Sequence, residues 1–359
     1  MATTLTDTSV PSPSDLATTA TPNEGLPPSA AMMGLITGYW TSQAVGTVAL
    51  LGVADHLNDG PRTAQELAKA VGADSQALSR VLRLLASIGV FAEVAPGSYG
   101  LTPLGATLTS DAPDSVRNFA ITETAPGHWL PWGRLEQSVR TGQPMAKEAL
   151  GMELFDWYGQ NPEEAGYFNA AMGDLSALAA DELVRVYDVS GVRTVADVAG
   201  AHGVLLAAVL KANPAARGIL FELPHVIATA EDEIAAQGLA ERCELVSGDF
   251  FVDALPAGAD LHILKQIAHD WDDARSTQIL QNCHRALTPG GTLLLVEMVI
   301  PADNQPSPAQ AMDLNMLVLL TGRERTEEEF RDLLHAAGFE LERVIPTHSP
   351  FFVIEARRT

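Results

Sequence analysis

The feature that most constrains this chain is a regular alternation of strand-like and helix-like segments that begins after Gly191. Short apolar runs such as TVADVA, GILFEL and TLLLVEMVI alternate with amphipathic segments such as HVIATAEDEIAAQGL and RSTQILQNCHRAL. This alternation predicts an α/β fold, a doubly wound and mostly parallel sheet with helices on both faces. No helical segment separates ELERVIPT from FFVIEARR, so these two predict an antiparallel pair at the sheet edge.

The N-terminal half begins with an apolar helical stretch. Apolar residues cover nearly every face of the segment Ala30–Leu57. A helix that is apolar all round must be buried. Burial against a second subunit would explain the pattern and predicts a homodimer held by these helices. A core helix within one subunit is the alternative, and the sequence alone leaves both open.

The next segment has the pattern of a winged helix. Two short helices are joined by a turn, and Asp74 or Ser75 is expected to cap the second helix. Val90–Phe91 and Tyr99–Leu101 then predict the strands of a small hairpin. The domain is otherwise expected to be all-α. A winged helix can bind DNA. However, the second helix carries only Arg80 and Arg83 as cations in a chain of net charge −23, which disfavours nucleic acid and anionic membranes as partners.

Composition and pattern together predict the division of the chain into a tail and three folded segments. We expect residues 1–28, rich in Thr, Ser, Pro and Ala, to form a disordered tail that is not a signal peptide. The winged-helix dimerisation domain then spans 29–112, a helical connector 113–185, and the ligand-binding α/β domain 186–359. Two cysteines at non-metal spacing predict reduced core thiols in a cytoplasmic protein, and we see no uninterrupted membrane-spanning run.

Large side chains are concentrated in the connector. They could line an apolar ligand pocket, although core packing explains any single one of them equally well. As a group they favour a pocket, and the candidate lining residues are Trp129, Trp132, Phe155, Phe168 and Met172.

The ends of four predicted strands carry the candidate site. Ligands of open α/β sheets bind beyond the carboxyl ends of the strands. A glycine turn after TVADV allows close approach of a ligand to the backbone. Glu222 could accept ribose hydroxyls, Asp249 could accept an adenine amino group, and Phe250 could stack on the ring. Together they predict a nucleoside-like ligand.

The motifs DVAGAHG, FELPHV, GDFF, HILKQIAHDWDD, LTPGGTLLLVE and GRERTEEEF resemble those of the plant caffeate and bacterial O-methyltransferase family, from about Ala31 to the C-terminus. The resemblance implies a homodimer that binds S-adenosylmethionine (SAM) without a metal. It implies His269 as general base, with Glu297 and Glu324 orienting it. The implied SAM-binding residues are Asp197, Gly200, Gly203, Glu222, Leu223, Asp249, Phe250 and Lys265. Asp270, Met172 and Met316 would lie near the substrate.

The chemistry predicted for His269 is proton removal. Because the SAM methyl group is already activated, the protein must align a nucleophile and deprotonate it. A neutral histidine of ordinary pKa, about 6.5, can take a proton from a hydroxyl near neutral pH. This favours methylation of a hydroxyl, and the resemblance implies that the acceptor is an aromatic or polyketide-type natural product. A non-enzymatic winged-helix regulator is a further, weaker hypothesis.

The glycine motif of the family is altered in this chain. Alanine stands at positions 199 and 201, on either side of Gly200, where the family normally has glycine. If the backbone has positive φ there, each alanine costs on the order of 1 kcal/mol. The change leaves room for a repurposed member of the fold that catalyses hydroxylation, decarboxylation or cyclisation.

Overall fold

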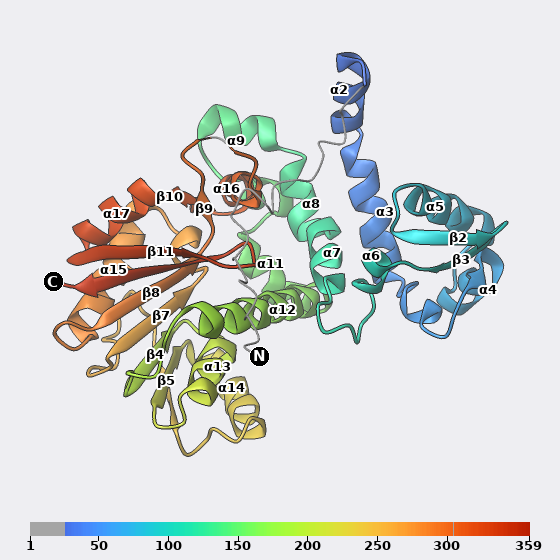
Figure 1. Ribbon diagram of the computed structural model, residues 1–359. Coiled ribbons are helices and arrows are strands. Elements are labelled where there is room, and N and C mark those ends of the chain that lie inside the picture. Colours follow the sequence, from blue (N-terminus) through green and yellow to red (C-terminus); the bar gives the residue numbers. More distant parts are fainter. Residues whose placement is uncertain (1–25, 304) are drawn as a thin grey trace, which may run out of the picture.

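The computed structural model describes residues 26–303 and 305–359. The predicted tail, apart from its end, lies outside these residues. An N-terminal domain stands to one side of the α/β domain, and a group of helices joins them (Figure 1). The elements of the N-terminal domain are α2 (Pro28–Ile36), α3 (Gly38–Leu50), η1 (Asp55–Leu57), β1 (Arg62–Thr63), α4 (Ala64–Val71), α5 (Ser75–Ser87), β2 (Phe91–Ala95), β3 (Ser98–Leu101) and α6 (Pro103–Ala106).

The winged helix is present, but the domain is not all-α. Asp74 caps α5 as predicted, its side chain accepting from the Ala77 amide at 2.8 Å. The expected hairpin forms between β2 and β3. The short strand β1 also pairs with β3, giving a three-stranded sheet in the order β1-β3-β2. A two-residue strand is too short to leave a pattern in the sequence.

The predicted helix over Ala30–Leu57 is broken. Thr37 separates α2 from α3, and its hydroxyl donates to the Met33 carbonyl at 2.8 Å. Helix α3 packs Val48 and Ala49 into the core of the domain. Helix α2 buries none of its residues within the chain, and Ile36 is 64% exposed. A core position within one subunit is therefore excluded for α2 but correct for part of α3.

The connector consists of α7 (Arg117–Thr124), α8 (Pro126–Trp132), α9 (Leu135–Thr141), α10 (Ala146–Leu150), α11 (Leu154–Gln160) and α12 (Pro162–Val186). The long helix α12 contacts α7 at one end and α13 of the α/β domain at the other. It forms the span between the two ends of the molecule in Figure 1.

The α/β domain contains β4 (Thr194–Val198), α13 (Val204–Ala212), β5 (Arg217–Glu222), α14 (Pro224–Ala236), β6 (Cys243–Ser247), β7 (Leu261–Lys265), η2 (Ala268–Asp270), α15 (Asp273–Ala286), β8 (Thr292–Glu297), β9 (Val299–Ile300), α16 (Pro308–Leu319), β10 (Arg325–Thr326), α17 (Glu327–Ala336), β11 (Phe339–Pro346) and β12 (Phe352–Arg358). The main sheet has the order β11-β12-β8-β7-β4-β5-β6. Strand β12 is antiparallel to both neighbours, and β11 lies at the edge, as predicted.

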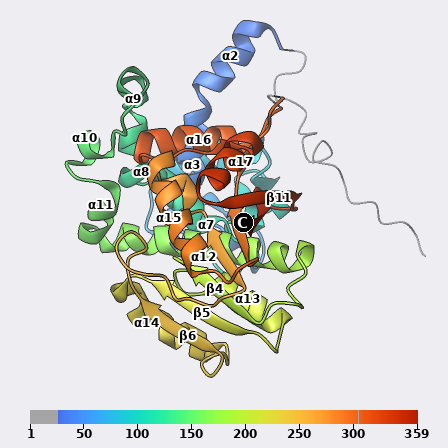
Figure 2. The same ribbon diagram turned by 90° about the vertical axis from the view of Figure 1, so that its left-hand side faces the viewer.

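The sheet is covered on both faces because its strands are apolar on both faces. Leu294 and Val296 of β8 pack with α12, α13 and α14, whereas Leu293 and Leu295 pack with α15 and α17. Figure 2 shows these helices on either side of the sheet. Strand β4 pairs with both β5 and β7, so the chain turns in opposite directions from it, and the edge beyond β4 is where a ligand is expected.

Two elements differ from the sequence prediction. TLLLVEMVI forms two strands, because after Glu297 the chain leaves the main sheet and β9 pairs with β10 instead. Helix α16 was not predicted. Its start does carry a signal, since Ser307 and Gln310 form a capping box with Pro308 at the first helical position. Both cysteines are buried and free, as expected. Within the described part of the chain, no helix combines the length and apolar character needed to cross a membrane.

The buried His262 makes the fold sensitive to acid. It lies in β7, and its ring nitrogens have no hydrogen-bond partner among the described residues. Burial lowers its pKa to about 3 from 6.5. Below pH 6.5 the unfolded chain takes up a proton that the folded chain does not, so stability falls with pH towards the folded pKa. By about pH 4.5 this removes roughly 3 kcal/mol.

We therefore expect His262→Leu to flatten the dependence of unfolding free energy on pH between 7 and about 4.5. Urea titrations at the two pH values measure it. Asp197, whose pKa burial raises to about 7, acts with the opposite sign and is common to both proteins, so the comparison isolates His262. An equal loss of stability in wild type and variant would contradict the assignment.

Candidate active site

The pairing of two short strands gathers the predicted catalytic residues. Strand β9 follows Glu297 and β10 follows Glu324, and Val299 pairs with Arg325 in parallel register. The two glutamates are therefore neighbours although far apart in sequence. His269 lies in η2, directly after the end of β7. His269, Glu297 and Glu324 each offer a ligand atom within 4.8 Å of the others, and all three are buried.

The imidazole is held between carboxylates. His269 Nδ1 lies 2.7 Å from Glu324 Oε1, and Nε2 lies 3.4 Å from Asp270 Oδ1. Glu297 Oε1 accepts hydrogen bonds from the Ile267 and Ala268 amides at 3.0 and 2.9 Å. Glu297 thus fixes the backbone that carries His269, while Glu324 fixes the ring.

The carboxylates also change the acidity of the cluster. Burial alone would lower the pKa of His269. The charge of Asp270, the hydrogen bond to Glu324 and the charge of Glu297 outweigh it and raise the pKa to about 9. Burial raises the pKa of Glu297 to about 7. The sequence-based expectation of an ordinary histidine pKa is therefore wrong, because three acids surround one imidazole at low solvent exposure.

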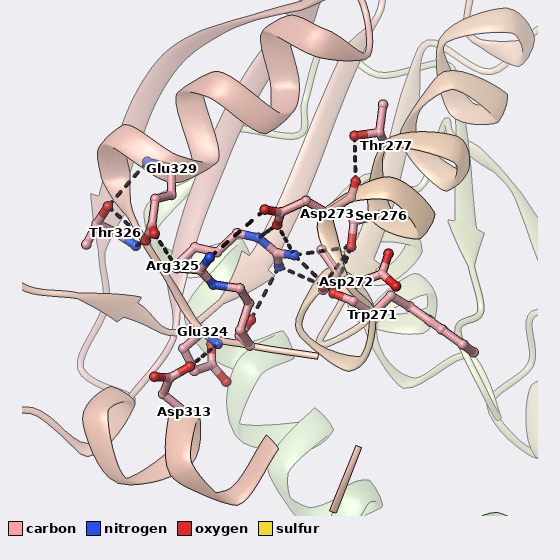
Figure 3. Close-up of polar contacts among 12 residues, drawn as sticks. Trp271, Asp272, Asp273, Ser276, Thr277, Asp313, Glu324, Arg325, Thr326 and Glu329 are labelled. Carbon is pink, nitrogen blue, oxygen red and sulfur yellow. Dashed lines mark hydrogen bonds and ion pairs between the residues drawn. The ribbon is translucent and has the colours of Figure 1, made fainter. Parts of the chain in front are cut away.

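Arg325, whose role the sequence analysis missed, holds the histidine segment in place. Its guanidinium is 1% exposed. It donates to the Ala268 and Trp271 carbonyls at 2.8 and 3.0 Å and to Asp273 Oδ1 at 2.8 and 3.0 Å (Figure 3). Only arginine has enough donors in a planar fork to bind these acceptors together. Its place inside GRERT was the available signal.

Glycine at position 322 permits the approach of the Glu324 segment. A Cβ there would overlap the backbone carbonyl of His269, and the neighbouring Arg323 amide donates to that same carbonyl at 2.9 Å. The Glu324 amide donates to Asp313 Oδ1 of α16 at 3.0 Å, as Figure 3 shows. Both contacts keep the Glu324 carboxylate beside the imidazole.

The altered glycine motif keeps a glycine-like backbone. Ala199 has φ 59° and Ala201 has φ 50°, both in the left-handed region. A Cβ at Gly200 would overlap the Asp197 carboxylate, so glycine is required there. Asp197 itself accepts from the Leu206 amide at 3.2 Å and braces the loop from beneath. Gly203, with φ 75°, is the N-cap residue directly before α13.

The other predicted cofactor residues lie at neighbouring strand ends. Glu222 accepts from the Leu223 amide at 3.1 Å, and burial raises its pKa to about 7. Asp249 Oδ1 accepts from the Phe251 amide at 2.8 Å, and the half-buried Phe250 lies beside it. Burial lowers the pKa of Lys265 to about 8. Carboxylate acceptors at two strand ends, with an aromatic ring, fit the hydroxyl and amino groups of a nucleoside.

The predicted substrate residues are only partly brought together. Trp132 and Phe168 pack in one apolar cluster with Val318 and Leu319 of α16. Phe155 lies beside Phe168 at a ring distance of 6.4 Å. Met316, which precedes Val318 in α16, is buried, and Met172 follows Phe168 by one turn of α12.

Trp129 departs from this group. It contacts Tyr39 of α3 at a ring distance of 6.1 Å and so faces the N-terminal helices. Asn315 was missed by the sequence analysis. Its Oδ1 accepts from Trp132 Nε1 at 2.7 Å and joins α16 to α8. No local sequence pattern predicts that contact between distant segments.

The order of the sheet, with Asp197 near the end of β4, Glu222 at the end of β5 and Asp249 after β6, defines a class I methyltransferase, an enzyme that uses SAM. Residues 132–340 match the O-methyltransferase domain model and residues 33–111 match the O-methyltransferase dimerisation domain model. The chain therefore belongs to the O-methyltransferase family that carries this dimerisation domain.

Among curated proteins, the chain is 43% identical over 332 residues to a phenazine O-methyltransferase of Lysobacter antibioticus, covering 92% of this chain and 97% of that one. The solved mitomycin 7-O-methyltransferase is 38% identical, with a TM-score of 0.84 over 92% of this chain and 98% of that chain. A methyltransferase of calicheamicin biosynthesis, bound to S-adenosylhomocysteine (SAH), is 35% identical with a TM-score of 0.83 over 92% and 98%. Similar curated proteins also include N-methyltransferases.

The positive φ angles make a testable prediction. A residue with a Cβ loses roughly 1–2 kcal/mol in the left-handed region. Replacing it with glycine removes this strain, but part of the gain is lost because glycine has more conformational entropy in the unfolded chain. We expect Ala199→Gly and Ala201→Gly each to stabilise the protein by about 1 kcal/mol in urea unfolding. Ala208→Gly, within helix α13, is the matched control and should destabilise by about 1 kcal/mol. Destabilisation by all three would contradict the loop geometry.

Proposed function

We propose that this enzyme transfers a methyl group from SAM to a hydroxyl of a small aromatic or polyketide-type natural product, with His269 as general base. The observation that carries the proposal is the buried imidazole held by Glu324 at 2.7 Å. The relatives named for phenazine and mitomycin support an aromatic acceptor.

The proposed proton transfer follows from the contacts of the ring. The proton on Nδ1 is donated to Glu324, which fixes the tautomer and leaves Nε2 to accept the substrate proton. The imidazolium that forms is stabilised by the carboxylates around it. SAM, when bound, supplies a methyl group activated by its sulfonium charge. Proton removal by a positioned base accounts for roughly 10²–10⁴-fold of the rate.

The roles of the other candidate residues are proposed from their positions in the fold. Gly200, Gly203, Glu222, Leu223, Asp249, Phe250 and Lys265 would bind SAM, with Asp197 supporting the loop. Trp132, Phe155, Phe168, Met172, Asp270 and Met316 would line the acceptor site, and Trp129 would lie at its rim towards the N-terminal helices. We also propose the division of the chain at about residues 112 and 185, and the match to the dimerisation domain, which ends at residue 111, supports the first of these boundaries. The free buried cysteines support a cytoplasmic location.

The pH dependence of turnover tests the base. kcat/KM reports the pKa of the free enzyme, so with a hydroxyphenazine acceptor it should rise with pH, be half-maximal near pH 9 and level off above that pH. Removing a negative charge beside His269 lowers its pKa, so Glu324→Gln should shift the profile to lower pH while reducing kcat. His269→Ala should reduce kcat by roughly 10²–10⁴-fold.

Calorimetric titration with SAM is the control for those variants, because they should bind the cofactor as wild type does. We also expect a metal-free reaction, although His269, Glu297 and Glu324 have the spacing of a metal-ligand set. Treatment with EDTA should therefore leave kcat unchanged. A pH profile that stays the same in Glu324→Gln would argue against His269 as base.

We also propose that α2 and α3 hold a homodimer. The apolar side chains Met33, Ile36 and Trp40 are 60%, 64% and 58% exposed, although the segment is rich in apolar residues throughout. Contiguous exposed apolar surface of this kind is typical of a subunit interface. The match of residues 33–111 to the dimerisation domain supports this assignment.

Sedimentation of two charged variants tests the dimer. Ile36→Asp places a carboxylate in the proposed interface and should convert the dimer to monomer at micromolar concentration, because an unpaired buried charge is strongly unfavourable. Val139→Asp, on the exposed face of α9, is the matched control and should leave the dimer intact. A monomeric wild-type protein, or a dimeric Ile36→Asp, would contradict the proposal.

A further inference from the structure

Four buried polar side chains in the connector, Thr122, His128, Ser138 and Tyr158, have no hydrogen-bond partner among the described residues, and two of them lie beside one aromatic ring. Tyr158 of α11 is 7% exposed and His128 of α8 is 4% exposed. Neither the tyrosine hydroxyl nor either ring nitrogen of the histidine makes a hydrogen bond within the described residues. Burying such groups unpaired costs free energy, so native proteins nearly always give them a partner. The partner is therefore to be sought outside the chain.

Both side chains border the same aromatic ring. Phe168 of α12 stacks on Tyr158 at a ring distance of 4.6 Å and lies 6.4 Å from His128. Phe168 also packs in the apolar cluster that includes Leu319 of α16. The segment after α16 reaches the catalytic histidine, since the Arg323 amide donates to the His269 carbonyl. The two groups therefore border the apolar cluster that joins the connector to α16, the helix that is followed by the Glu324 segment.

Negative charge surrounds the two side chains. Glu123 Oε1 lies 3.2 Å from His128 Nδ1, at an angle outside hydrogen-bond geometry. Glu164 already accepts from the Gly127 amide at 2.7 Å and from an indole at 3.2 Å. Burial first, and then the charges of Glu164 and Glu123, raise the pKa of Tyr158 above its usual range. Its hydroxyl therefore stays protonated and remains a donor.

We propose that Glu123, His128 and Tyr158 form a polar subsite that binds a hydroxyl or amino substituent of the acceptor substrate, on the side away from the methylated oxygen. A hydroxyl can accept from the unpaired Tyr158 hydroxyl and donate to Glu123, which lies beside His128. A carboxylate would be repelled by Glu123 and Glu164. The subsite rests on the proposed function, because it assigns one end of the same acceptor site.

Three naphthalene probes that differ in one substituent test the subsite. They are 2,7-dihydroxynaphthalene, 2-naphthol and 7-hydroxy-2-naphthoic acid, titrated by calorimetry into the full-length protein saturated with SAH. One net hydrogen bond corresponds to roughly 2- to 12-fold in affinity. We expect the dihydroxy probe to bind about tenfold more tightly than 2-naphthol, and the carboxylate to bind most weakly.

The variants separate the contributing groups. Tyr158→Phe and Glu123→Gln should each reduce the preference for the dihydroxy probe at least threefold while leaving 2-naphthol affinity unchanged. Glu123→Gln should also improve binding of the carboxylate probe, because it removes a like charge. Tyr187→Phe is the matched control, since that hydroxyl bonds Glu355 at 2.8 Å outside the connector, and it should keep the wild-type preference.

The subsite is overturned if wild type binds the three probes equally, if it binds none of them at millimolar concentration, or if the variants keep the preference. An intact preference would then mean that an ordered water satisfies the unpaired groups. Methyl transfer is followed separately as SAH release from SAM. Loss of transfer with an intact binding preference counts against the proposed function, and transfer without the preference counts against the subsite.

Discussion

The contact between His269 and Glu324 is the interaction on which the surrounding structure depends. A carboxylate and an imidazole are buried together, and buried charges are costly unless their remaining lone pairs and protons are satisfied. In this protein the second oxygen of Glu324 has no hydrogen-bond partner among the described residues, and the surrounding bonds instead hold the segments that carry the pair. Amides of residues 267 and 268 bond Glu297, and the buried guanidinium of Arg325 binds the carbonyls around His269. Removing one of these hydrogen bonds would leave a buried polar group without a partner and lower the free energy of unfolding.

The fold separates the two tasks of the enzyme. The parallel sheet presents acids at the ends of neighbouring strands, which suits a cofactor that is the same in every member of the family. The helices of the connector carry aromatic and polar side chains, such as the stacked Phe168 and Tyr158, to which we assign the acceptor in the proposed function. Helix α16 joins the two parts through the bond between Asn315 and Trp132. Under the function we propose, this arrangement lets acceptor recognition change while the chemistry around His269 is kept.

The alanines at positions 199 and 201 show how far tertiary structure overrides local preference. Alone, each would avoid positive φ, yet both adopt it between a buried strand and helix α13. The Asp197 side chain lies against the loop at Gly200 and accepts from the Leu206 amide, so the backbone of the loop has little room for another conformation. The loop thus carries strain that glycine would not, and strain of this kind persists only where the surroundings over-determine the conformation.

The sequence by itself determined the sheet, its covering helices and the residues at its strand ends, because alternating apolar patterns and capping residues act over a few neighbours. It also pointed to His269, Glu297 and Glu324 through motifs that resemble a known family. Tertiary structure alone decided the pairing of β9 with β10, the burial of Arg325, the raised pKa of His269 and the unpaired groups of Tyr158 and His128. Each of these depends on contacts and charges between segments far apart in the chain, and on the exclusion of water that only the packed molecule provides.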